Sequence, residues 1–510
     1  MITLNREDSL NGYIDSTDEA DFKAIKRIVK DFAIEDPKLK WTPAVRAGHS
    51  DGKVYFIHKK NLTFQLGLTP LIEQKLIEHG YKYENNIERI EYSHTPASQL
   101  AEELLLPFTP YEFQLDGVDY ILGNEKGIVQ SATGSGKSLI IYMAIEAIID
   151  DADAKVLLLV PDIGLVNQMK SDILSYAEDM DETDLHCIYG GKEKDADKQI
   201  IISTWQSIYD MKADSTLFQS VTDILVDEVH MAQAGSYQKL FNKMNNVRRR
   251  FGLTGTMPKD LIEKLKLIGT FSEVKQIVTA RELIDMGLAT ETFVQPIFLK
   301  YTEEQRVLSL PNPNEETTKY LKEMAFIKEH KERMSVIIKH VIKTARHDNG
   351  NSIVLFRNVA YGKKLYQIIK KNHEHTFFVS GEVDGETREE IRKNMSKYTD
   401  AILVGTSKIM EKGINIPSLR YSHIVQNTKA ETGIIQGLGR LMRLADDKEA
   451  SICFDYVDDL RYTTRPSKKN PNGRMQNNYT MNWYLDRLDS YEEYEFNVRN
   501  PITAVFKEIF

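Results

Sequence analysis

The residues best suited to chemistry lie in a glycine-rich segment at 131–138, Ser-Ala-Thr-Gly-Ser-Gly-Lys-Ser. A short apolar run precedes this segment, and a helix-like run rich in Ile, Ala and Met follows it at 139–149. Strand, glycine-rich loop and helix in this order form a cradle for phosphate, because glycine lets backbone N–H groups approach an anion and the helix N-terminus adds partial positive charge. Lys137 can reach the β- and γ-phosphates, and the Ser138 hydroxyl suits Mg²⁺. The segment therefore predicts a nucleoside triphosphate site, with Ser131 standing where the first glycine is usual.

A pair of carboxylates, Asp227 and Glu228, ends a second apolar run at 224–226. Strand carboxyl ends and a phosphate loop lie at the same edge of a parallel sheet, so the pair is expected beside the phosphates. Asp227 is expected to help hold Mg²⁺ through its water shell, and Glu228 to orient and deprotonate the attacking water. Two hydroxyls at the end of another strand, Thr254 and Thr256, could sense the loss of the γ-phosphate.

A third group of residues lies at 436–443, Gln-Gly-Leu-Gly-Arg-Leu-Met-Arg. Arg440 and Arg443 are three positions apart and share one face of a helix. Their guanidinium groups keep their charge and bind phosphate oxygens through two nitrogens. Because they belong to a second α/β region, they can reach the nucleotide only across a cleft. This arrangement predicts a two-lobed motor in which nucleotide binding closes the cleft and hydrolysis opens it.

Two series of short apolar strands alternate with helical patterns and must position these residues. The first series is expected at 127–132, 155–160, 199–203, 223–227 and 250–254, and the second at 352–356, 376–379, 401–405, 421–425 and 451–455. Such alternation is the signature of a parallel sheet covered on both faces. A polar stretch and a long charged helix are expected between the two series, at 291–350. The fold class is therefore α/β, with two units of similar size.

Four domains are predicted. Residues 1–95 form a small α+β N-terminal domain, with helices at 21–32 and 71–79, a strand at 53–58 and a linker at 92–99. Residues 96–290 form the first lobe and 291–465 the second. Residues 466–510 form a basic loop and a short helical cap, with the helix at about 481–498.

Composition limits the possible partners. The 510 residues carry a net charge of −9, so nucleic acid can bind only at local patches. One such patch, between residues 22 and 60, has an excess of six positive charges and includes Arg46 and Lys53. The two cysteines are far apart and are expected to be reduced. No apolar run is long enough to span a membrane and the N-terminus does not resemble a signal peptide, so we expect a monomeric cytoplasmic protein, in the host cytoplasm if it is encoded by a phage.

The order of these motifs resembles that of the superfamily 2 helicases. The segments that correspond to the motifs of this family are 133–138, 160–168, 203–206, 227–230 (a DExH box), 254–256, 353–357, 404–417 and 436–443, and the segment 110–114 resembles the one that reads adenine. The segments 48–53, 80–82 and 379–388, together with the C-terminal basic loop and Tyr-rich helix, are similar to phage helicases of recombination and branch migration. Asn415 stands where this family usually has an acid.

The resemblance implies two RecA-like lobes and the cofactors ATP and Mg²⁺. It implies the following roles: catalysis by Lys137, Asp227, Glu228, Gln436, Arg440 and Arg443; ATP binding by Phe113, Gln114, Thr133, Gly134, Ser135, Gly136, Lys137, Ser138 and Gly413; Mg²⁺ binding by Ser138 and Asp227; and contacts to nucleic acid by Arg46, Lys53, Thr204, Gln206, Arg357 and Thr406. Gln114 is expected to bond the edge of the base. The partners implied are single-stranded, duplex and branched DNA, with RNA in RNA–DNA hybrids as a further one.

The expected function is that of an ATP-dependent DNA helicase or translocase which unwinds and branch-migrates forks, Holliday junctions, D-loops and R-loops in recombination, repair and replication. An RNA helicase is an alternative, because the DExH box occurs with both substrates. The motor part of a restriction enzyme is disfavoured, because fewer than 70 residues follow Arg443. A P-loop protein that moves no nucleic acid is also disfavoured, because it would not need two arginines on a second lobe.

Overall fold

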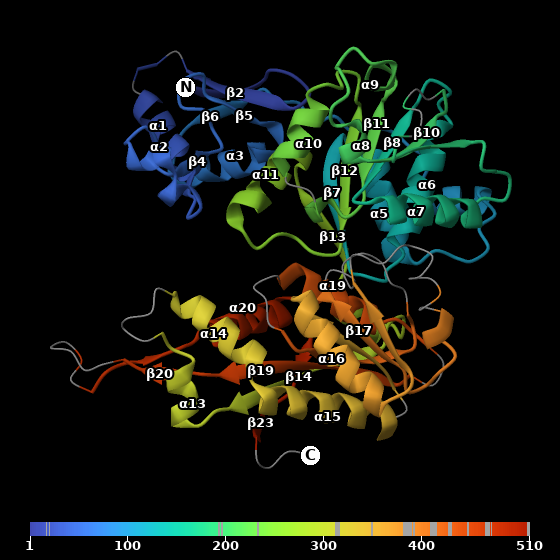
Figure 1. Ribbon diagram of the computed structural model, residues 1–510. Helices are drawn as coiled ribbons and strands as arrows, with labels where there is room; N and C mark the ends of the chain where they lie inside the picture. Colours follow the sequence, from blue (N-terminus) through green and yellow to red (C-terminus); the bar gives the residue numbers. More distant parts are fainter. Residues whose placement is uncertain are drawn as a thin grey trace. The chain divides into compact units, whose positions relative to one another are not determined.

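The chain folds into two compact units in the computed structural model (Figure 1). The first consists of residues 1–131 and 135–278, and the second of residues 279–510 together with the short segment 132–134. The structure describes all residues except 17, 20, 192–193, 195–196, 232–233, 312–316, 348–349, 381–389, 391–392, 408–415, 427–430, 446–447, 465–469, 471 and 507–510. Among the described residues, none of the helices has both the length and the apolar character that a membrane span requires.

The first unit begins with a small sheet of order β5-β2-β1-β6, on which the helices α1 and α3 pack. Its elements are β1 (Ile2–Arg6), β2 (Asn11–Ser16), α1 (Asp21–Asp31), β3 (Ala33–Glu35), α2 (Pro43–Arg46), β4 (Lys53–Tyr55), β5 (Thr63–Gln65), α3 (Thr69–Glu78) and β6 (Tyr83–Asn85). The hydrophobic core of this region includes Ile262 and Leu265 of a helix far along the chain, α11 (Leu261–Phe271). Gly67 approaches this helix so closely that a Cβ would lie 2.0 Å from the Ile268 carbonyl oxygen. The N-terminal region and the rest of the first unit therefore share one core.

A parallel sheet of order β13-β7-β12-β11-β8-β10-β9 forms the centre of the first unit. Its strands are β7 (Lys126–Ser131), β8 (Val156–Val160), β9 (Leu185–Ile188), β10 (Ile200–Thr204), β11 (Asp223–Val226), β12 (Arg249–Thr254) and β13 (Val274–Val278). The helices are α4 (Ala97–Glu103), α5 (Glu112–Gly123), α6 (Lys137–Ile149), α7 (Ile163–Tyr176), α8 (Trp205–Ile208), α9 (Thr216–Ser220), α10 (Ala234–Phe241) and α11. β9 and β13 were not predicted from the sequence.

Alternate side chains of each strand enter two different cores. Leu225 of β11 packs with α5, α6 and α7, whereas its neighbours Ile224 and Val226 pack with α10 and α11. Figure 1 shows these two groups of helices on opposite faces of the sheet. The pattern is that of a doubly covered parallel sheet, and it brings the carboxyl ends of β7, β12, β11 and β8 to one edge.

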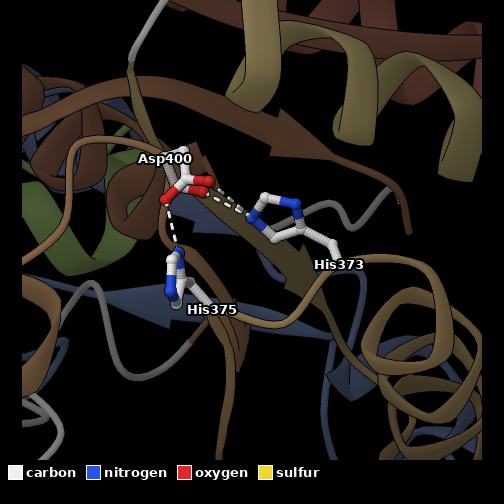
Figure 2. A group of neighbouring side chains, drawn as sticks. All are labelled: His373, His375 and Asp400. Atoms are coloured by element: carbon white, nitrogen blue, oxygen red, sulfur yellow. Dashed lines mark hydrogen bonds and ion pairs between the residues drawn. The ribbon is translucent and has the colours of Figure 1, made fainter.

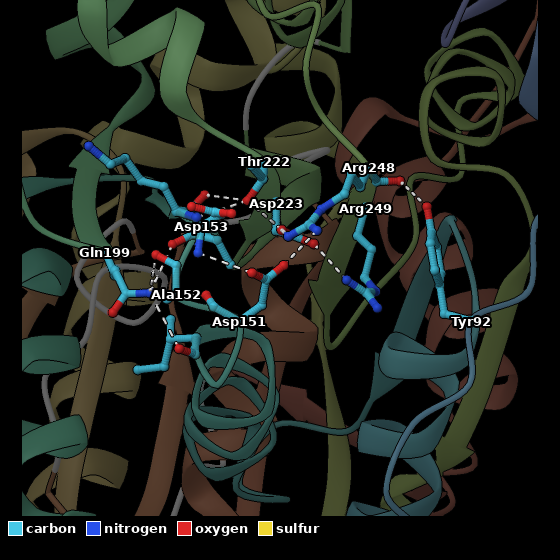
Figure 3. A network of polar contacts seen from close by, with 12 residues as sticks. Tyr92, Asp151, Ala152, Asp153, Gln199, Thr222, Asp223, Arg248 and Arg249 are labelled. Carbon is cyan, nitrogen blue, oxygen red and sulfur yellow. Dashed lines mark hydrogen bonds and ion pairs between the residues drawn. The ribbon is translucent and has the colours of Figure 1, made fainter.

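The opposite edge of this sheet is held by a polar network (Figure 3). Asp223 is fully buried and accepts hydrogen bonds from Arg248 and Arg249, and Arg248 also pairs with Asp151. The Tyr92 hydroxyl donates to the Arg248 carbonyl oxygen at 3.2 Å. The segment 92–99, predicted to be a linker, is therefore anchored on the lobe, and its last three residues already belong to α4, which begins at Ala97.

The second unit is built on another parallel sheet, of order β16-β17-β15-β18-β19-β14-β22, with β23 also paired to β14. Its strands are β14 (Glu291–Lys300), β15 (Asn351–Phe356), β16 (Thr376–Val379), β17 (Ile402–Thr406), β18 (Leu419–Ile424), β19 (Ala450–Asp459), β22 (Asn497–Val498) and β23 (Ile502–Val505), with a separate hairpin of β20 (Tyr462–Thr463) and β21 (Met475–Gln476). Its helices are α12 (Ala280–Asp285), α13 (Glu303–Leu308), α14 (Lys319–Glu329), α15 (Lys331–His347), α16 (Val359–Asn372), α19 (Glu431–Leu441) and α20 (Tyr479–Glu493).

Two expectations for this unit need correction. The stretch at 291–300 is the strand β14 and lies inside the sheet, and the single charged helix is in fact two helices, α14 and α15, separated at His330. The C-terminal region contains the predicted helix, α20, but β22 and β23 also extend the sheet. Arg487 of α20 forms a fully buried ion pair with Asp455 of β19. The fold class, two RecA-like parallel-sheet lobes with a small N-terminal α+β region, is confirmed.

Candidate active site and nucleic-acid surfaces

The phosphate loop has the conformation that the glycines predict. Gly134 and Gly136 have φ angles of 89° and 81°, a region that other residues rarely adopt. Gly136 is the N-cap of α6 and, as a glycine, has no side chain to accept a hydrogen bond from the first N–H groups of the helix. A Cβ at Gly136 would lie 2.4 Å from the Gln114 amide nitrogen. The loop thus leaves a helix N-terminus available to an anion.

Lys137 lies at the centre of the polar groups in this loop. Its Nζ donates to the Ser131 carbonyl oxygen at 3.3 Å and lies 3.8 Å from Glu228 Oε1. The buried hydroxyls of Ser131 and Ser135 are hydrogen-bonded to each other. Ser131, which stands where the first glycine is usual, therefore adds a hydrogen bond within the loop.

The two carboxylates follow β11, as predicted, and differ in their surroundings. The Asp227 N–H donates to the Leu159 carbonyl oxygen of β8 at 2.8 Å, and the Asp227 carboxylate accepts a hydrogen bond from the Glu228 N–H at 2.9 Å. Burial and the charge of Glu228 raise the pKa of Asp227, and Lys137 opposes this rise. A bound cation would act in the same direction as Lys137. Glu228 has a φ of 48°, a strained conformation of the kind found at functional sites.

His230 connects these carboxylates to the next strand. Its Nδ1 lies 2.7 Å from the Thr254 hydroxyl and 3.5 Å from Glu228 Oε2. The Thr254 hydroxyl also donates to the Thr256 carbonyl oxygen at 2.8 Å. Burial lowers the pKa of His230, which favours a neutral imidazole. A continuous chain of polar contacts therefore runs from Lys137 through Glu228 and His230 to the predicted sensing hydroxyls.

Two aromatic residues to which the sequence analysis assigned no role of their own lie beside the candidate site. The Tyr176 hydroxyl bonds Ser138 Oγ at 2.9 Å, on the side chain expected to bind Mg²⁺. Tyr111 is 48% exposed and stacks on the buried Phe113 at a ring separation of 5.6 Å. Tyr111 lies within the predicted adenine-reading segment, whereas nothing in the sequence indicated Tyr176.

Gln114 contacts protein groups at both ends of its amide. Its Nε2 donates to the Ser135 carbonyl oxygen at 2.8 Å, and its Oε1 accepts from the Tyr111 N–H at 2.9 Å. The bond to Ser135 fastens α5 to the phosphate loop, and the bond from Tyr111 closes the first turn of α5. A bond from Gln114 to a base edge stays a prediction.

The second unit carries Gln436 and Arg440 on α19, and Arg443 two residues beyond the end of this helix. The end of this helix is capped by Lys448, whose Nζ donates to the carbonyl oxygens of Leu441 at 2.5 Å, Arg443 at 2.8 Å and Pro417 at 3.2 Å. Burial lowers the pKa of Lys448 to about 7. No pattern in the sequence indicated this lysine. Gly413 and the segment 381–388 lie outside the described residues.

The residues predicted to contact nucleic acid lie on both units and differ in exposure. Gln206 and Arg357 are exposed, Thr406 is half-buried at the end of β17, and Thr204 is 4% exposed with its hydroxyl bonded to Ser207.

The N-terminal basic patch lies largely on the surface. Lys23, Lys26, Arg27 and Lys30 are exposed on α1, and Arg46 is exposed on α2. Lys53 lies 3.9 Å from Glu35. Trp41 is 68% exposed beside Lys40, so the patch offers both cations and an aromatic surface.

Comparison with known proteins agrees with this architecture. The family model "Type III restriction enzyme, res subunit" matches residues 87–259, and "Helicase conserved C-terminal domain" matches residues 332–445. Each family model covers less than half of the chain, and together with the relatives below they indicate a helicase of the superfamily 2 type.

Individual relatives agree with this assignment. The chain is similar to the ATP-dependent DNA helicase uvsW of Enterobacteria phage T4, with 27% identity over 91% of this chain and 93% of the relative. It is also similar to putative helicase 22 of Sulfolobus islandicus filamentous virus, with 25% identity over 66% of this chain and 61% of the relative. A fragment of a putative HsdR subunit of a type I restriction enzyme from Vibrio vulnificus shares the fold, with a TM-score of 0.55, 15% identity, and coverage of 82% of this chain and 73% of the other.

Proposed function

We propose that this protein is an ATP-dependent DNA helicase or translocase that unwinds and branch-migrates branched DNA in recombination, repair and replication. The observation that carries the proposal is the contact chain from Lys137 to Thr254 at one sheet edge of a superfamily 2 lobe. The DNA substrate is supported by the similarity to uvsW over nearly the whole chain.

The residues present fit ATP and Mg²⁺. The loop combines two glycines of positive φ with an uncapped N-terminus of the 13-residue helix α6, which suits phosphate. Asp227 and Ser138 supply the oxygen donors that Mg²⁺ prefers. When bound, Mg²⁺ would neutralise charge on the phosphates. Burial and the neighbouring Glu228 raise the pKa of Asp227, so a bound cation would favour its charged form.

Each residue has a separate role in the proposed reaction. Lys137 binds phosphate oxygens, Glu228 orients and deprotonates water, and His230 links Glu228 to Thr254. Arg440 and Arg443, which belong to the second unit, stabilise phosphate charge in the transition state. Tyr111 offers an exposed aromatic face on which the base can stack.

DNA contacts are proposed on both lobes and on the N-terminal region. Arg357, Gln206, Thr204 and Thr406 would contact backbone phosphates, which carry no sequence information. The N-terminal basic patch would hold duplex DNA through cations and counterion release. Because its net charge is −9, the whole chain should bind DNA only through such local surfaces.

A nucleic-acid panel tests this function. ATP hydrolysis by the full chain is measured alone and with single-stranded, duplex, forked and four-way DNA and with RNA. We expect DNA, and branched DNA most strongly, to stimulate hydrolysis. Stimulation by RNA alone would support an RNA helicase, and hydrolysis indifferent to every nucleic acid would contradict the proposal.

A further inference from the structure

A cluster of two histidines and one aspartate lies in the second unit, away from the residues discussed above (Figure 2). His373 directly follows α16, His375 directly precedes the edge strand β16, and Asp400 lies two residues before β17. β16 and β17 are parallel neighbours, with Thr376 opposite Ile402. The cluster therefore lies at the amino ends of these strands, whereas Arg357 and Thr406 lie at the carboxyl ends.

The side chains converge on the Asp400 carboxylate. His375 Nδ1 lies 2.7 Å from Oδ1, and His373 Nε2 lies 3.6 Å from Oδ2. One donor atom from each of the three residues lies within 4.8 Å of the others. Donors bound to zinc at about 2.0–2.1 Å in a tetrahedral arrangement are about 3.3 Å apart, so small side-chain rotations would bring this set to the required separation.

The chemistry of the set indicates which cation it suits. Two imidazoles and one carboxylate are ligands of Zn²⁺ and related transition metals, whereas Mg²⁺ prefers oxygen ligands alone. Within the described part of the chain, no lysine or arginine forms an ion pair with Asp400, whose partners are the two histidines. His375 Nδ1 faces the Asp400 carboxylate, and His373 Nε2 lies 2.7 Å from the Asp400 carbonyl oxygen. A metal ion bound by these two nitrogens would take the place of the protons in these contacts.

Burial and packing restrict the cluster. His373 is 4% exposed, and the ring of His375 stacks on Tyr398 with centroids 3.8 Å apart. His375 and Asp400 are 32% and 30% exposed, which leaves a path for an ion to enter and for water to take the remaining coordination position. Such an ion would fasten the C-terminal end of α16 and the edge strand β16 to β17.

We propose that His373, His375 and Asp400 form a binding site for a divalent transition metal, with Zn²⁺ as its preferred ion. This proposal is independent of the nucleotide and DNA sites. The metal site lies at the amino ends of β16 and β17, opposite the carboxyl ends that carry Arg357 and Thr406. Metal binding there requires neither ATP nor DNA.

Calorimetric titration of the full-length, metal-free and nucleotide-free protein with ZnCl₂ tests the proposal. We expect one saturable site that MgCl₂ does not occupy. His375→Ala and Asp400→Asn should each weaken Zn²⁺ binding at least tenfold, in line with the loss of one of three ligands. The matched control is His49→Ala, which removes an exposed histidine outside the cluster and should leave the affinity unchanged.

Thermal unfolding and Co²⁺ spectroscopy provide independent evidence. Zn²⁺ should raise the unfolding temperature of the wild type and of His49→Ala but not of His375→Ala, because a ligand stabilises the state that binds it. Co²⁺ should give visible d–d absorption that Asp400→Asn removes. Absence of a saturable site, or equal affinity in wild type, His375→Ala and Asp400→Asn, would overturn the proposal and leave a hydrogen-bonded clamp between α16, β16 and β17.

Discussion

Replacing Glu146 by glutamine should stabilise the first unit, because the negative charge of this carboxylate is partly buried and poorly solvated. Glu146 lies on α6, and its Oε1 is buried without a hydrogen-bond partner among the described residues. Burial raises the pKa of its carboxyl group from 4.5 to about 7. Glutamine keeps the shape of the side chain and removes the charge.

The magnitude follows from the pKa. A change from 4.5 to about 7 corresponds to about 3 kcal/mol at about 1.4 kcal/mol per pKa unit, and partial exposure of the side chain reduces this to about 1–2 kcal/mol. Because the folded state binds the proton more tightly than the unfolded state, its stability falls as the pH rises from 4.5 to 7. The increase in the free energy of unfolding caused by Glu146→Gln should therefore be complete at pH 8 and should shrink to less than half of that value at pH 5.

Urea unfolding followed by tryptophan fluorescence measures this effect. Trp483 belongs to the second unit, so a Trp483→Phe background leaves Trp41 and Trp205, both in the first unit, as reporters. The matched control is Glu178→Gln, at an exposed position just beyond α7. If the stability gained by Glu146→Gln is the same at pH 5 and pH 8, or if the variant is less stable than its parent at pH 8, the charge of Glu146 is not what destabilises the first unit.

Three further predictions concern the proposed function. Lys137→Ala should abolish ATP hydrolysis, and Glu228→Gln should keep ATP binding but block turnover; normal turnover in either variant, measured by phosphate release, would contradict the assigned roles. Arg443→Ala and Arg440→Ala should each lower kcat by about 10³-fold or more with a smaller effect on ATP affinity, and an effect on affinity alone would exclude the proposed action on the transition state. Arg46→Ala and Lys53→Ala should each reduce by about one the slope of log K against log salt for duplex DNA; an unchanged slope in fluorescence anisotropy would indicate that the basic patch is only a solvated surface.

The elements of both lobes could be predicted where strands are short, apolar and bounded by turns, as at 223–226 and 402–406. β14 was missed because Pro296 lies in its middle and proline is rare inside a strand, although this strand is paired within the sheet to β19. β9 and β13 were missed because they are the two edge strands of their sheet, where His186, Lys275 and Gln276 interrupt the apolar pattern.

The site was predictable where chemistry depends on residues close in sequence. The 131–138 loop and the Asp227–Glu228 pair carry their own signals. Tyr176 and Lys448 carry none, because their importance comes from what the fold places beside them, the Ser138 hydroxyl and the carbonyl groups at the end of α19. The shared core of the N-terminal region with α11 is likewise a property of tertiary packing.

The most direct test of the central proposal is strand exchange in a fluorescently labelled four-way DNA junction. The full-length protein should convert the junction to its migrated or separated products with ATP, but not with a non-hydrolysable ATP analogue, and Lys137→Ala should bind the junction without converting it. Conversion without ATP hydrolysis, conversion by Lys137→Ala at the wild-type rate, or no conversion of any branched DNA by an actively ATP-hydrolysing wild type would contradict the proposed function.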